Sequence, residues 1–221
     1  MRLSKHLFLF FCLTLLFSGY VFSQRPFQAD INAFKKQDSI QMPPANSILF
    51  VGSSSFAKWK DVQDYFPGYT IINRGFGGSS LPDVYGYAND IIFPYKAKQI
   101  VIYCGENDFT ASDTVSVATV VDRTVKLFNL IRDKQPNVAI LYVSMKPSPS
   151  RRLLMPKFEK ANEVIKAYLS TQPNTGYADV YHPMLNENKE PRESLFTDDN
   201  LHMNAEGYGL WQTIIQPLLV R

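Results

Sequence analysis

The amino-acid sequence predicts one α/β domain, a three-layer α/β/α sandwich with a five-stranded parallel sheet in the middle. Short, uninterrupted apolar runs alternate along the chain with segments whose apolar residues recur every three or four positions. Runs of the first kind are typical of parallel strands buried on both faces, and the recurring spacing is typical of the helices that cover them. The chain has 221 residues, of which 45% are hydrophobic and 19% charged. These values exclude a disordered chain and fit a single core.

Five apolar runs are predicted as the strands of this sheet. Each is short, and most of them end at a glycine or at another turn-forming residue, as buried strands commonly do. In chain order they are Ile48–Val51, Tyr69–Ile72, Gln99–Cys104, Val138–Met145 and Tyr177–Tyr181.

The segments between and after these runs are predicted as helices. The longest has apolar residues along one side and is stopped by Pro136, and the last is capped by Asn204 and ended by Pro217. A further helix is expected over Phe27–Lys36, in the polar lead-in at residues 24–47. The main helices are expected at Ser55–Phe66, Leu81–Ile92, Ser112–Lys134, Pro156–Thr171 and Ala205–Gln216.

The first 23 residues have the layout of a secretory signal peptide. Arg2 and Lys5 precede the apolar run Leu7–Phe17, and small or neutral residues follow it, so cleavage is expected before Gln24. The alternative is a transmembrane anchor, but this run would be about 16 Å long as a helix, against roughly 30 Å of hydrocarbon. We therefore expect export to the periplasm or the extracellular space, with no stable membrane insertion after cleavage.

The remaining residues limit the chemistry available to the protein. Residues 1–23 hold two basic residues and no acidic one, so their removal lowers the formal charge from +3 to +1, which argues against a nucleic-acid partner. One cysteine, Cys104, cannot form an internal disulfide, and one cysteine with two histidines makes no zinc-type cluster. We expect no metal and no cofactor, with chemistry carried by Ser, His, Asp and amide side chains.

Polar motifs follow the predicted strands at the points where those strands end. In an open α/β sheet the ligand site lies beyond the carboxyl ends of the strands, so these motifs are the candidate functional residues. They are Gly52-Ser53-Ser54-Ser55, Asn73-Arg74-Gly75-Phe76-Gly77-Gly78-Ser79, Gly105-Glu106-Asn107-Asp108 and, before the last helix, Asp199-Asn200-Leu201-His202.

Each motif could supply one part of a catalytic site, and each also has an ordinary structural explanation. A serine on a tight strand-to-helix turn exposes its hydroxyl, although serine is also a common helix cap. Asn107 could donate its NH₂ to an oxyanion, although asparagine also forms turns. Asp199 can reach Nδ1 of His202, three residues on, which would leave Nε2 as a general base. The glycine loop does not match the dinucleotide motif G-x-G-x-x-G, because Ser80 stands at the third glycine position.

In this order, the four motifs resemble the sequence blocks of the SGNH hydrolase superfamily, whose members are also called GDSL esterases and lipases. The resemblance runs from Ile48 to Tyr208. It implies a flavodoxin-like α/β/α fold for an SGNH hydrolase domain over residues 48–221, and the hydrolysis of carboxylic esters without a cofactor.

The resemblance also implies a role for each motif. Ser54 is expected to be the nucleophile, His202 the general base and Asp199 the carboxylate that orients it. The oxyanion hole is expected to consist of the N–H groups of Ser54 and Gly78 and the side-chain amide of Asn107.

One position departs from the family pattern, because Ser53 stands where the family usually has aspartate. This leaves Ser53 and Ser55 as alternative nucleophiles, although Ser54 holds the family position, third from Gly52. The α/β-hydrolase motif G-x-S-x-G does not fit, because Phe56 stands where its second glycine would be.

The expected reaction is hydrolysis of short-acyl esters, such as acetyl esters of glycans or small molecules, through an acyl-enzyme. The preference for short acyl groups follows from a compact chain in which no inserted lid or second module is evident. A lysophospholipase or thioesterase of the same superfamily is an alternative, as is an inactive glycan-binding module, which the change at Ser53 would favour.

Three other features are expected to be structural. Cys104 lies at a buried strand end and should pack in the core. His182, beside Pro183, should be a structural or surface residue. Arg151 and Arg152 should lie in a solvated loop, with contact to an anionic substrate as the alternative.

Overall fold

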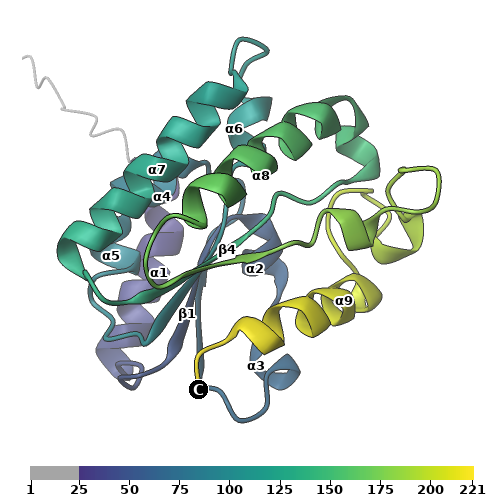
Figure 1. Ribbon diagram of the computed structural model, residues 1–221. Helices are drawn as coiled ribbons and strands as arrows, with labels where there is room; N and C mark the ends of the chain where they lie inside the picture. Colours follow the sequence, from purple (N-terminus) through teal and green to yellow (C-terminus); the bar gives the residue numbers. More distant parts are fainter. Residues whose placement is uncertain (1–24) are drawn as a thin grey trace, which may run out of the picture.

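The structure, a computed structural model, describes residues 25–221, and the signal peptide predicted at residues 1–23 lies outside the described part of the chain. Five parallel strands form one sheet in the order β2-β1-β3-β4-β5. Helices cover both faces of this sheet (Figure 1), which confirms the predicted α/β/α architecture. The strands are β1 (Ile48–Gly52), β2 (Ile71–Gly75), β3 (Gln99–Tyr103), β4 (Ala139–Val143) and β5 (Thr175–Ala178).

The helices differ widely in length, from 4 to 18 residues among the α-helices. The α-helices are α1 (Gln28–Ile40), α2 (Ser54–Lys58), α3 (Val62–Tyr65), α4 (Leu81–Gly86), α5 (Ala88–Ile91), α6 (Glu106–Thr110), α7 (Val117–Lys134), α8 (Met155–Leu169) and α9 (Ala205–Ile215). Short 3₁₀ helices occupy η1 (Pro149–Leu154), η2 (His182–Met184), η3 (Glu193–Leu195) and η4 (Gln216–Leu218).

The sheet divides the apolar core into two layers, because successive side chains of a strand point to opposite faces. In β1, Leu49 and Val51 pack with α1, α4, α5, α7 and α8, whereas Ile48 and Phe50 pack with α2, α3 and α9. All four side chains are fully buried. Burial on both faces explains why the strands read as continuous apolar runs in the sequence.

Two segments predicted as single helices are each broken in the structure. The segment predicted at residues 55–66 forms α2 and α3, because Trp59 leaves helical geometry (ψ 70°) with its indole fully buried and stacked on Tyr208 at 4.7 Å. The segment predicted at residues 81–92 forms α4 and α5, because the chain leaves the helix at Tyr87, directly after the poor helix former Gly86.

Several element boundaries differ from those predicted, among them β2, which begins at Ile71 instead of residue 69, and α1, which ends at Ile40 instead of residue 36. The long helix α7 begins at Val117 instead of residue 112, because the Ser116 side chain accepts a hydrogen bond from the Thr119 N–H (3.1 Å) and caps it. The fifth strand begins at Thr175 instead of residue 177, in register with β4. The short helix α6 was not predicted, because five residues are too few to show a helical period.

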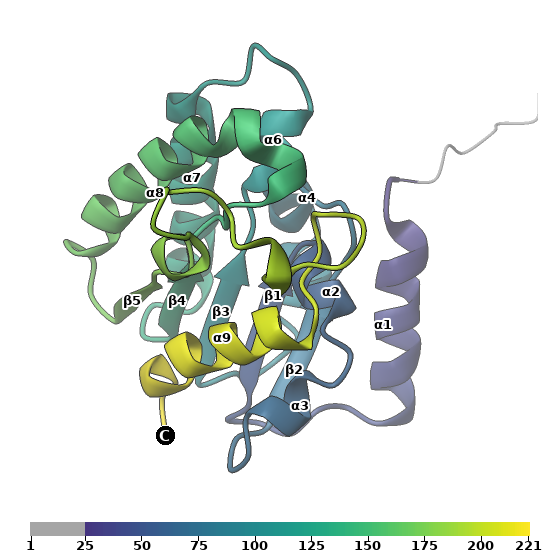
Figure 2. The same ribbon diagram turned by 90° about the vertical axis from the view of Figure 1, so that its right-hand side faces the viewer.

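The N-terminal helix α1 is fixed to the domain by a buried polar cluster. Arg74 on β2 pairs with Asp38 on α1, and its Nε donates to the Tyr95 hydroxyl (2.5 Å), which in turn donates to Asp38 (2.5 Å). Ile31 of the same helix is fully buried. Figure 2 shows α1 running along one side of the domain.

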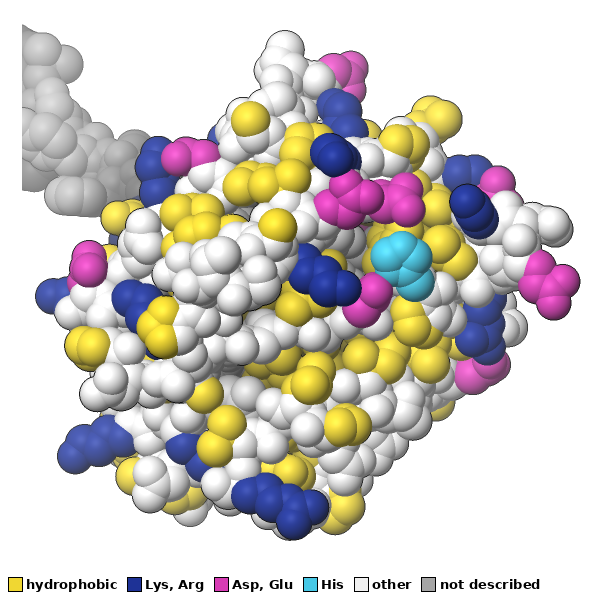
Figure 3. Space-filling model, in the orientation of Figure 1, with side chains coloured by type: hydrophobic (Ala, Val, Ile, Leu, Met, Phe, Trp, Pro, Cys, Tyr) yellow, Lys and Arg dark blue, Asp and Glu magenta, His cyan; other side chains and the backbone are white. Residues whose placement is uncertain are grey.

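The surface seen in the orientation of Figure 1 carries charges of both signs. Lysine and arginine side chains are scattered among acidic ones and do not gather in one patch (Figure 3). Among residues 25–221, no helix is both long enough and apolar enough to cross a bilayer.

Candidate active site

The turn after β1 presents one serine of three to solvent. Gly52 has φ +139°, and a Cβ there would lie 1.9 Å from the carbonyl oxygen of Tyr103, so only glycine fits. After this turn Ser53 and Ser55 are buried, with 5% and 1% exposure, while Ser54 is partly exposed at the start of α2. The geometry therefore favours Ser54 over the alternative nucleophiles. Its backbone N–H donates to no backbone carbonyl of the described residues.

The glycine loop after β2 is fixed against this turn. The Ser79 hydroxyl contacts the carbonyl oxygens of Gly52 (3.1 Å) and Phe76 (3.0 Å), and the Phe76 N–H also donates to Gly52 (2.9 Å). Gly78 is exposed, has φ +82°, and donates its N–H to no backbone carbonyl in residues 25–221. Its N–H is therefore available to a ligand at the carboxyl edge of the sheet.

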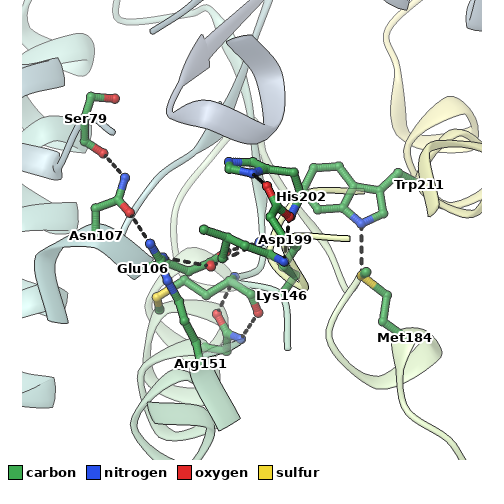
Figure 4. Close-up of polar contacts among 12 residues, drawn as sticks. Ser79, Glu106, Asn107, Lys146, Arg151, Met184, Asp199, His202 and Trp211 are labelled. Carbon is green, nitrogen blue, oxygen red and sulfur yellow. Dashed lines mark hydrogen bonds and ion pairs between the residues drawn. The ribbon is translucent and has the colours of Figure 1, made fainter. Parts of the chain in front are cut away.

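The side-chain amide of Asn107, on α6 after β3, is held at both ends. Its Nδ2 donates to the carbonyl oxygen of Ser79 (2.9 Å), and its Oδ1 accepts a hydrogen bond from Nη2 of Arg151 (2.8 Å). Figure 4 shows this chain of contacts from the glycine loop to Arg151. An amide NH₂ has two protons, so one remains available to a ligand.

Asp199 and His202 form the pair that their spacing predicted. Oδ2 of Asp199 lies 2.5 Å from Nδ1 of His202, and Oδ1 accepts the N–H groups of Leu201 (2.9 Å) and His202 (2.8 Å) and the hydroxyl of Thr197 (2.9 Å). Burial alone would raise the pKa of Asp199, but these hydrogen bonds outweigh it and hold that pKa well below its usual range. The carboxylate is therefore ionised at neutral pH.

The other ring nitrogen of His202 is buried and unpaired. Nε2 is shielded from solvent and has no hydrogen-bond partner among the described residues. Because Asp199 occupies Nδ1, Nε2 is the nitrogen left to accept a proton.

A second Asp-x-x-His sequence, Asp179 to His182, has nearly the same local geometry. Its Nδ1–Oδ2 distance is 2.8 Å, and Asp179 accepts the N–H groups of Tyr181 and His182. However, the His182 side chain is 63% exposed, against 14% for His202, and its Nε2 lies 3.9 Å from Glu159. His182 is thus a surface histidine, as expected.

A buried cluster of charged residues lies behind Asn107, and the sequence motifs did not reveal it. Glu106 is bound by Nζ of Lys146 (3.2 and 3.3 Å) and by Nη1 of Arg151 (3.1 Å). Lys146 is fully enclosed; burial lowers its pKa, while the charge of Glu106 opposes that shift. The sequence signals for this cluster were the place of Glu106 in the third motif and the position of Lys146 directly after the fourth apolar run.

The expectation of a solvated loop is wrong for one arginine of the pair. The Arg151 side chain is 16% exposed and binds Glu106 and Asn107, because η1 packs it against α6. Arg152 is 51% exposed and pairs with Glu190 on the surface (2.6 Å).

Two further buried residues, Asp108 and Cys104, lie in or next to the motif that contains Asn107. Asp108 is fully buried, accepts the Leu81 N–H (2.9 Å), and pairs with Arg123 (2.7 Å); burial raises its pKa despite these contacts. Cys104 is buried as expected, and burial raises the pKa of its thiol well above the ordinary value, so it is no thiolate nucleophile.

No metal centre is evident in the part of the chain that the structure describes. Residues 25–221 contain no group of three or more His, Cys, Asp or Glu side chains placed to hold an ion.

Comparison with known proteins identifies similar sequences and folds. A family model described as the GDSL-like Lipase/Acylhydrolase family matches residues 46–210, which include all the site residues above. No curated protein matches the sequence.

Solved structures with the same fold share few residues with this chain. A GDSL-like lipase from Bacteroides thetaiotaomicron has TM-score 0.73 and 21% identity, covering 86% of this chain and 97% of that one. A candidate acylhydrolase from Bacteroides fragilis has TM-score 0.74 and 21% identity, covering 86% and 96%. A candidate platelet activating factor from Streptococcus pneumonia has TM-score 0.76 and 18% identity, covering 87% and 92%.

Proposed function

Since the chain belongs to the GDSL-like lipase/acylhydrolase family and is a hydrolase acting on ester bonds, we propose a mechanism for that hydrolysis. The reaction proceeds through a covalent acyl-enzyme on Ser54. The observation that carries the proposal is the Asp199–His202 pair, whose Nε2 is buried and unpaired. An ionised Asp199 that accepts Nδ1–H fixes the ring tautomer and leaves Nε2 as the base.

In the acylation step, Nε2 of His202 takes the Ser54 hydroxyl proton as Oγ attacks the ester carbonyl carbon. The carbonyl oxygen becomes an oxyanion and is bound by the N–H groups of Ser54 and Gly78 and by the free Nδ2 proton of Asn107. Loss of one such donor typically costs about 10²–10³ in turnover. The imidazolium then protonates the alkoxide as the ester C–O bond breaks, and the alcohol leaves.

In the deacylation step, His202 acts again as the base. Nε2 takes a proton from water as the water oxygen attacks the acyl carbon, and the proton passes to Oγ of Ser54 as the acyl–serine bond breaks. The products are a carboxylic acid and the free enzyme, so atoms and charge balance without a metal or organic cofactor.

We propose short acyl groups, such as acetyl, on glycans or other bulky alcohols as the substrates. The support is the openness of the site: Gly78 is exposed, and the Asp199 side chain is 45% exposed. An open edge admits a large alcohol but offers little surface on which to bury a long acyl chain.

A fluorophosphonate probe tests the nucleophile and the base on protein that lacks residues 1–23. Wild-type protein should be labelled at Ser54, and Ser54→Ala or His202→Ala should abolish labelling. His182→Ala is the matched control, since it disrupts the other Asp-x-x-His pair and should label normally. Folded protein that never labels would contradict the acyl-enzyme and favour a binding module.

An acyl-chain series tests the substrate class. Turnover of p-nitrophenyl esters should be highest for acetate and fall toward decanoate, and acetylated sugars should release acetate. A maximum at decanoate would instead indicate a lysophospholipase-like preference, and preference for acyl thioesters would indicate a thioesterase.

We further propose that residues 1–23 direct export and are removed. The support is the sequence layout described above. Expression of the full chain in a bacterial host should yield exported protein whose first residue is Gln24. Protein that stays in the cytoplasm with Met1 intact would contradict this proposal.

A further inference from the structure

We propose that Arg151 is a positioning residue, which holds the Asn107 amide in the orientation that the oxyanion hole requires. The inference rests on the proposed function, since it concerns the third donor of that site. It extends that function to the loop after β4, which the four sequence motifs do not include.

The contacts of Asn107 admit only one orientation of its amide. A side-chain amide can be rotated to exchange its oxygen and nitrogen. Arg151 has only N–H donors, so the atom that faces it must be Oδ1 (2.8 Å); the carbonyl oxygen of Ser79 only accepts, so the atom that faces it must be Nδ2 (2.9 Å). Both neighbours therefore select the orientation that places the NH₂ group on the side of the glycine loop.

The second contact also restricts the movement of the amide. With Ser79 alone, the amide could pivot about a single hydrogen bond. With Arg151 on the opposite atom, the amide plane is fixed at two points, so its free proton keeps one direction before substrate arrives. A preorganised donor of this kind needs no reorganisation as the oxyanion forms.

Arg151 is itself anchored. Its Nη1 donates to Glu106 (3.1 Å) while its Nη2 donates to Asn107, so the two arms of the guanidinium hold consecutive residues of α6. Glu106 is 4% exposed and is also bound by the buried Lys146. A lysine at position 151 would keep the charge that faces Glu106, but its single ammonium lacks the fixed fork that spans both partners.

The first test measures kcat and KM for p-nitrophenyl acetate in Arg151→Lys and Arg151→Met. Both should lower kcat by about tenfold or more, up to the roughly 10²–10³ that loss of one oxyanion donor costs, and change KM less than twofold. Arg152→Met is the matched control, because its half-exposed side chain pairs with Glu190 on the surface and makes no hydrogen bond to Asn107 or Glu106, and it should behave as wild type. Wild-type kcat in Arg151→Lys would overturn the proposal, and this variant retains the charge beside Glu106 even if Arg151→Met does not fold.

A double-mutant cycle separates positioning from substrate binding or a general effect on folding. If Arg151 acts through Asn107, replacing Arg151 should have little further effect on kcat in an Asn107→Ala background. An equal loss of kcat in both backgrounds would mean that Arg151 acts elsewhere, and the proposal would fail.

A measurement without substrate distinguishes failure of this proposal from failure of the proposed esterase. The ¹⁵N order parameter of Asn107 Nδ2, assigned by its loss in Asn107→Ala, should be close to that of rigid backbone in wild type. It should drop toward flexible values, below about 0.6, in Arg151→Lys. An unchanged value would overturn the positioning role even in an active enzyme. Wild-type protein that never labels with fluorophosphonate would contradict the proposed acyl-enzyme mechanism. The order parameter would still show whether Arg151 fixes the Asn107 amide.

Discussion

Two Asp-x-x-His pairs in this protein have the same local hydrogen bonds but different surroundings. In both, one carboxylate oxygen accepts backbone N–H groups and the other binds Nδ1 of the histidine. The difference lies in Nε2, which is buried and unpaired in His202 and lies on an exposed ring in His182. A histidine becomes a useful base when its free nitrogen is shielded and aimed at a nucleophile, and the tertiary structure provides that shielding.

At this scale we expect Asp199→Asn to abolish most activity without unfolding the protein. The asparagine Oδ1 would keep the backbone N–H contacts, so its NH₂ would face Nδ1 and force the proton onto Nε2, the wrong tautomer for a base. Turnover should fall by about 10³–10⁴-fold, as in comparable triads.

The matched control is Asp179→Asn, which makes the same change in the other pair and should leave turnover within about twofold of wild type. Steady-state kinetics with p-nitrophenyl acetate measure both variants. Full activity in Asp199→Asn would exclude His202, oriented by Asp199, as the general base.

The conformation of Gly52 gives a second prediction for a single residue. Gly52→Ala should destabilise the protein by about 4 kcal/mol or more, because its Cβ would meet the Tyr103 carbonyl at 1.9 Å and φ is +139°. Gly209→Ala is the control, since it lies in α9 with nothing within 4 Å, and it should stabilise by about 0.5–1 kcal/mol. Urea unfolding measures both, and equal midpoints would contradict the steric argument.

At the scale of elements, two of the site residues lie on short helices directly after strands. Ser54 begins α2, and Asn107 lies in the first turn of α6, so strand ends position both side chains with little intervening chain. Asp108, in the same turn, fixes α6 to α4 and α7 through Leu81 and Arg123. A five-residue helix cannot be stable alone, and these tertiary contacts hold it in place.

The contact of α1 with the sheet predicts an alkaline dependence of stability. Burial and the hydrogen bond to Asp38 raise the pKa of Tyr95 to about 12, above its usual value of 10. A raised pKa means that the folded state holds the proton more tightly. The stabilisation is therefore complete below pH 10 and is lost as pH rises toward 12.

Tyr95→Phe tests this dependence. At pH 8 the substitution should lower the free energy of unfolding by about 1–3 kcal/mol, since it removes a buried hydroxyl with two charged partners. The difference from wild type should shrink between pH 10 and 12. Tyr85→Phe, at a 47% exposed position, should show no difference at any pH. If the effect of Tyr95→Phe on stability is the same at every pH, the raised pKa of the Tyr95 hydroxyl is contradicted.

At the scale of the whole molecule, the lead-in before β1 is part of the packed structure. Ile31 is fully buried, and Asp38 pairs with the buried Arg74, so α1 contributes to the core layer on its side of the sheet. Protein without residues 1–23 should therefore fold normally. Protein without residues 1–47 should lose several kcal/mol of stability, because it exposes apolar surface and deprives Arg74 of its carboxylate partner Asp38. Identical thermal midpoints for the two truncated proteins would contradict this role.

The fold class, the family and the four motifs at the strand ends could all be predicted from the amino-acid sequence. These features are local: apolar runs report burial on both faces, and Asp199 and His202 bind each other because they are three residues apart. The folded structure was needed to show which serine is accessible, which histidine is shielded, and that Arg151 binds Asn107. Those outcomes depend on how η1, α6 and the loop before α9 pack at one edge of the sheet. The contact between Asn107 and Arg151 joins residues 44 positions apart, and neither such a contact nor the burial of one side chain produces a periodic pattern in the sequence.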